Sequence, residues 1–164
     1  MNTKKIIAID PDTQKSGVAE LIIPEMSMNI STLSFPYLID YLWHVKDNFL
    51  DDGQSVTVLV EAGWLNQSNW HVGWKNNNRE AAAIGNSTGR NHETGRKIIE
   101  MARHFGFPVE EIRPLRKCWT GKDGKITHEE LQRYLLSQRI DFPFKRSNQE
   151  QRDAALIAAV YSDK

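Results

Sequence analysis

An apolar run that ends in an acid is the feature that most constrains how this chain folds. Residues 6–9 read Ile-Ile-Ala-Ile and are followed at once by Asp10, a proline and a polar loop, before a second apolar run begins at Gly17. A short, β-branched run without a polar face predicts a strand that is covered on both sides. A carboxylate at the end of such a strand is costly unless it is paired or bound to a cation. The sequence therefore predicts a sheet with an acid held at its edge.

The remaining segments predict an α/β fold in one domain, residues 1–164. The first two strands are joined by a short polar loop and should form an antiparallel hairpin, whereas the strands that are reached through a helix should be parallel. We therefore expect a mixed five-stranded sheet flanked by helices on both faces. Strands are expected at 4–10, 17–23, 28–34, 56–60 and 108–113, and helices from Pro36, at 79–105 with Gly85, Gly89 and Gly95 as places for a break, after the capping-box pair Thr127 and Glu130, and at 147–161.

Composition is that of an ordinary soluble protein. Apolar residues make up 40% and charged residues 26% of the chain, and no apolar stretch approaches the roughly 20 residues that span a bilayer. The apolar run near the N-terminus is too short for a signal peptide. The single cysteine, Cys118, excludes an internal disulfide framework and suits a reducing compartment. We expect a cytoplasmic protein that makes no membrane contact.

Charge is unevenly distributed along the sequence although the formal net charge is zero. Residues 1–61 hold 4 Lys or Arg against 9 Asp or Glu, and residues 75–125 hold 11 against 6, so a net charge of −5 is followed by one of +5. This asymmetry is compatible with an acidic metal-binding region beside a basic surface for phosphates, and equally with ordinary surface variation.

Three further acids complete a candidate metal site. Glu61 ends its apolar run as Asp10 ends the first one, and Glu150 and Asp153 lie three residues apart on one face of the last predicted helix. Alanines follow this pair, so the helix can lie close against the sheet. Two acids at a helix N-terminus commonly just complement the helix dipole. Four acids at one edge instead indicate divalent cations, because Mg²⁺ prefers oxygen ligands and paired ions support phosphodiester cleavage.

The order of these motifs resembles the RuvC-type Holliday-junction resolvases of the ribonuclease-H-like superfamily. The resemblance spans residues 4–161 and is carried by the strand ending in "IDP", the "VTVLVE" strand, the long middle helix and the terminal "EQRDAALIA". It implies a ribonuclease-H-like fold and an endonuclease that uses two Mg²⁺ ions, for which Mn²⁺ can substitute. It also implies that branched DNA, four-way junctions above all, is nicked in recombination and repair, often by a homodimer. The resemblance assigns Asp10, Glu61 and Asp153 to catalysis and metal binding and places Glu150 where the family usually has another acid.

The chain departs from the family pattern at Asp12, where the family usually has glycine. Its side chain could tighten the turn or add a carboxylate near the metals. Two other functions remain open beside junction cleavage. One is a nuclease of the related YqgF type that acts on structured RNA, and the other is a catalytically degenerate module that only binds nucleic acid.

Several residues are candidates for contact with nucleic acid. Trp64, Trp70 and Trp74 lie in a polar loop after Glu61, and Trp64 is the first choice for stacking on an unpaired base, the alternative being a contact with the core edge or a dimer partner. Arg79, Arg90, Lys122 and Lys125 are candidates for phosphate contacts, and a solvated helix face is the alternative for such residues. His71 and His92 could assist proton transfer, although isolated histidines more commonly belong to the surface or the core.

Overall fold

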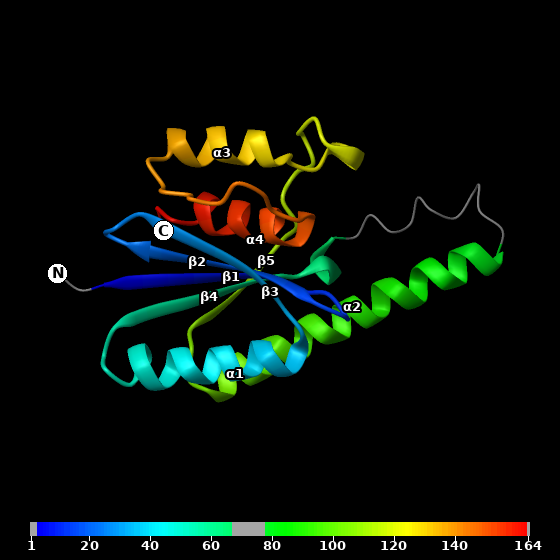
Figure 1. Cartoon of the computed structure of the whole chain (residues 1–164). Helices are drawn as coiled ribbons and strands as arrows, with labels where there is room; N and C mark the ends of the chain where they lie inside the picture. The colour runs from blue at the N-terminus through cyan, green and yellow to red at the C-terminus, as the bar shows by residue number, and fades with distance from the viewer. Residues whose placement is uncertain (1–2, 67–77, 164) are drawn as a thin grey trace.

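The computed structural model describes residues 3–66 and 78–163 and shows a five-stranded sheet with helices on both faces (Figure 1). The sheet order is β3-β2-β1-β4-β5, with β1 antiparallel to β2, β2 antiparallel to β3, and β4 parallel to both β1 and β5. This confirms the expected mixed sheet. The strands are β1 (Lys4–Asp10), β2 (Ser16–Ile23), β3 (Ser27–Leu33), β4 (Ser55–Glu61) and β5 (Val109–Ile112).

In the described part of the chain, four α-helices form the two outer layers. Figure 1 shows the green and cyan ribbons below the sheet and the yellow and red ribbons above it. Side chains of β1 alternate between the layers, as those of a strand must. Ile7 and Ile9 pack with the first two helices, whereas Ile6 and Ala8 pack with the last two. The helices are α1 (Phe35–Val45), which continues as a π-helical turn over Lys46–Leu50, α2 (Asn78–His104), α3 (His128–Ser137) and α4 (Gln149–Val160).

Helix α4 lies close against the sheet because small residues line the contact. Its alanines at 154, 155, 158 and 159 are all buried. On the sheet side, Gly17 of β2 leaves room for the main chain of α4, since a methyl group there would overlap the carbonyl oxygen of Glu150. Gly17, the second residue of β2, therefore lets the first turn of α4 sit against the sheet.

Helix α2 runs unbroken past all three of its glycines, so the suggested break is wrong. Among residues 3–66 and 78–163, a side chain at Gly85 or Gly89 would meet nothing within 4 Å, whereas Gly95 is closely approached by Trp64. Figure 1 shows the N-terminal part of α2 extending past the end of the sheet. No helix in the described part of the chain is long and apolar enough to cross a membrane.

Candidate active site

Strand register places Asp10 and Glu61 side by side at one edge of the sheet. β1 and β4 are parallel neighbours and Ile9 pairs with Val60, so the next residue of each strand leaves the sheet at the same level. Carboxyl ends of parallel strands are where α/β folds commonly build their sites. Both acids are therefore carried by rigid backbone.

Helix α4 brings the other two acids to this edge. The helix begins at a capping box in which the Asn148 side chain accepts a hydrogen bond from the Gln151 amide and the Gln151 side chain accepts one from Asn148. This start places Glu150 and Asp153 in the first turns, over the end of β1. The structure thus brings together the four acids named from the sequence, while their catalytic and metal-binding roles stay predictions.

The acids line a cleft with two lobes. The first lobe contains Asp153 together with Arg116, Lys117 and Trp119 from the loop after β5. The second lobe contains Glu150 together with Asp12, Trp64 and Asn91. Both lobes share the residues at the centre of the cleft, which are Asp10, Glu61, Gly63, Thr88, His92 and Lys125.

Negative charge is concentrated at the centre of the cleft. Burial raises the pKa of Asp10 well above its usual range, and the charges of Glu61, Asp153 and Glu150 raise it further against an opposing effect of Lys125. Burial followed by the charge of Asp153 also raises the pKa of Glu61, and the charges of Lys125 and Lys117 lower it. The carboxylates therefore repel one another in a setting that favours a bound cation.

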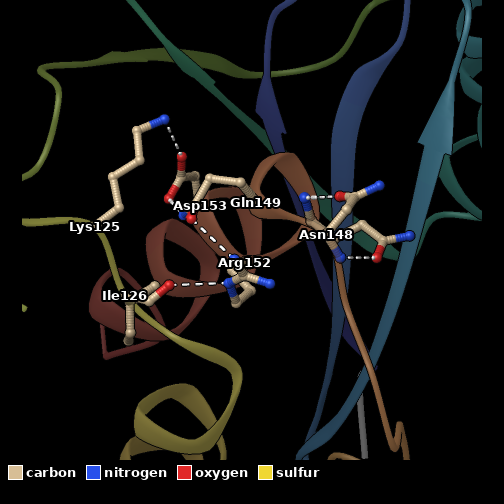
Figure 2. A network of polar contacts seen from close by, with 7 residues as sticks. Lys125, Ile126, Asn148, Gln149, Arg152 and Asp153 are labelled. Carbon is tan, nitrogen blue, oxygen red and sulfur yellow. Dashed lines mark hydrogen bonds and ion pairs between the residues drawn. The ribbon is translucent and has the colours of Figure 1, made fainter. Parts of the chain in front are cut away.

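Lys125 is in direct contact with one of the acids (Figure 2). Its Nζ lies 3.3 Å from Oδ2 of Asp153, while Gln149 Nε2 donates to Oδ1 of the same carboxylate at 2.7 Å. Arg152 joins this lysine's loop to α4, because its Nε donates to the carbonyl oxygen of Ile126 at 2.9 Å. Its Nη2 also donates to Oε1 of Gln149 at 2.9 Å. One guanidinium thus positions the groups on both oxygens of Asp153.

The donor set fits a hard divalent cation, although its present geometry does not yet form the site. Among residues 3–66 and 78–163, no three His, Cys, Asp or Glu side chains are arranged to hold a metal ion as they stand. Asp153 is engaged by Lys125 and Gln149 instead. Asp10 and the three carboxylates around it nevertheless supply the oxygen ligands and the excess negative charge that Mg²⁺ selects. Metal binding would require Asp153 to exchange the lysine for the ion.

Lys117 contributes to the cleft beside Lys125, which was predicted together with Lys122 to contact phosphate. Lys117 lines the first lobe, whereas Lys122 is exposed and lies outside both lobes. Glu130 closes the loop that runs from Thr120 to Thr127. It accepts hydrogen bonds from the Thr127 amide at 2.9 Å and the Thr120 amide at 3.0 Å. These hydrogen bonds lower the pKa of Glu130 to about 2. The predicted capping box is confirmed, and it also holds the cationic loop in place.

Trp64 and Asp12 have clear structural contacts beside the site. Trp64 packs against Gly95, and the Arg96 guanidinium lies 4.9 Å from its ring centroid, so the contact with the core edge is present and base stacking stays a prediction. Asp12 Oδ1 accepts hydrogen bonds from the amides of Gln14 and Lys15 at 2.8 and 3.2 Å. The side chain therefore tightens the turn, which is one of the two roles expected for it. Arg79 and Arg90 are exposed on α2, while Trp70, Trp74 and His71 lie outside the described residues.

Comparison with known proteins gives a likeness at the level of solved structures. No family model matches the chain, and no curated protein matches it. A structure of Thermus thermophilus RuvC is 15% identical with a TM-score of 0.48, over 96% of this chain and 93% of that one. A structure of T. thermophilus RuvC in complex with a Holliday-junction substrate is 13% identical with a TM-score of 0.45, over 97% of this chain and 92% of that one.

Proposed function

We propose that this protein is a metal-dependent endonuclease that cleaves phosphodiester bonds in branched DNA, four-way junctions above all, in recombination or repair. The observation that carries the proposal is the convergence of four acids from β1, β4 and α4 in a cleft that also holds Lys117 and Lys125. A module that only bound phosphates would gain nothing from acids that repel them. The preference for junctions rests on the resemblance of the ordered motifs, and a homodimer would allow two symmetric cuts.

Asp10, Glu61, Glu150 and Asp153 would hold the metal ions. When bound, Mg²⁺ supplies activation of a water and stabilisation of the leaving oxygen. Asp10 and Glu61 contribute rigid positions, because their strands are hydrogen-bonded on both sides within the sheet. Carboxylates that are already in place need little reorganisation during the reaction.

The lysines of the cleft would face the phosphate of the substrate. Lys125 is paired with Asp153 in this structure, and Lys117 is close enough to Glu61 to lower its pKa. Once cations neutralise the acids, both ammonium groups become available to the phosphate oxygens. The hydrogen bond from Arg152 to Ile126 keeps the backbone next to Lys125 in place, so the lysine side chain alone needs to move.

The exposed cations outside the cleft would hold the flanking DNA. Arg79 and Arg90 on α2 and Lys122 at the loop tip are accessible for phosphate contacts. Such contacts release counterions, so affinity for DNA should fall steeply as salt is raised. Trp64 would stack on a base only if the strand displaced Arg96 from its ring or used the other ring face.

A direct test is cleavage of three labelled substrates, a four-way junction, a linear duplex and a structured RNA, with Mg²⁺ or with a chelator. The protein is compared with Asp10→Asn, Asp153→Asn and, as a matched control, Asp123→Asn, an exposed acid outside the cleft. Junction cleavage that needs Mg²⁺, Asp10 and Asp153 but not Asp123 supports the proposal. Cleavage of RNA alone would indicate the YqgF-type activity instead. Binding without any cleavage would indicate a degenerate module.

A further inference from the structure

One face of α2 packs in the core near the C-terminal end of the helix and lines the cleft further toward the N-terminal end. Residues 88, 92, 95, 99 and 102 follow a helical spacing of three or four and share this face. Ile99 and Ala102 are buried in the core under the sheet, and Gly95 is covered by Trp64. Thr88 and His92 line the cleft beyond the sheet edge. The stripe therefore ends in polar groups at the point where the acids lie.

His92 stands where the two lobes of the cleft meet. It borders both lobes, as do Asp10, Glu61 and Lys125. Lys125 comes from the loop before α3, which packs on one face of the sheet, whereas α2 packs on the other. A strand that crosses the acids from one lobe to the other would therefore pass between His92 and Lys125.

The imidazole of His92 is held in its place by two neighbouring groups. Its ring meets Trp64 edge-on, with 5.8 Å between the ring centroids. On its Nε2 side it faces Gly63, where a methyl group would lie 2.8 Å from that nitrogen. The glycine two residues after Glu61 thus makes the space that this ring occupies beside the acids.

We propose that His92 binds the nucleic-acid strand in the cleft, through a hydrogen bond from its imidazole to a phosphate oxygen on the side opposite Lys125. This contact rests on the proposed function and adds a substrate-binding residue to it. Burial and the nearby Arg96 lower the pKa of His92, so the ring stays uncharged at neutral pH and offers one directed N–H donor. An uncharged ring forms no ion pair with the surrounding carboxylates, so its N–H can donate to the phosphate.

The test measures the dissociation constant of a four-way junction on the Asp10→Asn background, so that cleavage does not interfere. His92→Phe keeps a ring beside Trp64 but removes both nitrogens, whereas His92→Gln keeps an amide donor. His104→Phe is the matched control, because His104 is exposed in the last turn of the same helix. We expect roughly tenfold weaker binding for His92→Phe, since a hydrogen bond to a charged group is lost. Binding of His92→Gln should stay within about threefold of the parent.

Three outcomes would overturn this contact. The first is an unchanged dissociation constant for His92→Phe, and the second is an equal loss in both variants at unchanged melting temperature. The third is a lower kcat in the Asp10-containing protein with unchanged binding, which would place His92 in the chemical step. If His92→Phe fails to fold, His92→Ala is measured in its place by the same criteria. If the parent neither binds nor cleaves branched DNA, the proposed function itself fails, a result distinct from normal activity with silent His92 variants.

Discussion

Two acids of the same sheet, Glu20 and Asp10, have opposite electrostatic surroundings. Glu20 on β2 has its own cation, because Lys5 Nζ lies 3.2 Å from its Oε2, and Tyr41 donates to the same oxygen at 2.6 Å. Asp10 at the end of β1 is instead surrounded by three other carboxylates that raise its pKa. A buried acid with a dedicated partner contributes to structure, whereas a buried acid among acids depends on a cation from outside.

The Lys5–Glu20 pair should contribute more to stability than the carboxylates around Asp10. Lys5 is almost fully buried, its side chain 4% exposed, and its Nζ also lies 3.4 Å from the ring centroid of Phe49. We expect Lys5→Met to lower the free energy of unfolding by about 3–5 kcal/mol, because it leaves the largely buried Glu20 without its cation. Denaturant unfolding followed by circular dichroism measures the loss.

The neighbouring Lys4 supplies the control for this change. It lies next along the same strand and is only partly buried. Lys4→Met should therefore change stability by about 0.5 kcal/mol or less. If Lys5→Met costs no more than Lys4→Met, the Lys5–Glu20 pair does not stabilise the fold and the comparison with Asp10 loses its basis.

An added cation that binds the carboxylates around Asp10 should stabilise the folded state. At a Mg²⁺ concentration 100 times its dissociation constant, we expect the folded state to gain about 2.7 kcal/mol. Thermal unfolding with and without Mg²⁺ measures the gain, with Na⁺ at matched ionic strength as the control. The gain should disappear in Asp10→Asn and persist in Glu20→Gln. An equal response in all three proteins would show that Mg²⁺ binds elsewhere.

Neutralising the two acids should change stability in opposite directions. Without metal, we expect Asp10→Asn to raise the free energy of unfolding by about 0.5–2 kcal/mol, the usual gain when a site arranged for function is relaxed. Glu20→Gln should lower it, because the charge of Lys5 would then be buried without an opposite charge beside it. Denaturant unfolding in a chelator gives both values. A destabilised Asp10→Asn would mean that its carboxylate is structurally satisfied.

The parts of the fold that were predictable from sequence are those set by local pattern. The run that ends at Asp10 and the run that ends at Glu61 each mark a strand and its terminal acid within a few residues. Thr127 and Glu130 mark a helix start in the same way. These signals need no knowledge of distant contacts, and they were sufficient for the sheet and for the four acids.

The parts that the sequence left open or missed depend on contacts between distant segments. The sequence left open whether Trp64 stacks on a base or contacts the core edge, and Gly95 on α2 makes the slot that accepts its ring. The same helix stays unbroken because its C-terminal half is anchored in the core, which outweighs the cost of about 1 kcal/mol for each exposed glycine. Lys117 lines the cleft, and Gly124 packs closely against its backbone. Sequence spacing alone carries none of this.

The pH dependence of stability gives the smallest but most specific test of the comparison. A carboxyl whose pKa is raised on folding favours the folded state when protonated, so its contribution is full below the ordinary pKa and is lost as pH rises through the raised one. In chelator, the stability advantage of Asp10→Asn over the parent should therefore shrink as pH falls from 7 to 5. Glu130 does not interfere, because its lowered pKa of about 2 confines its opposite effect to pH values below that window. Using the difference between the two proteins also cancels the histidines, including His92, whose lowered pKa favours the folded state at higher pH. A difference that stays constant from pH 7 to 5 would contradict the assignment of Asp10 as an acid left uncompensated by the fold.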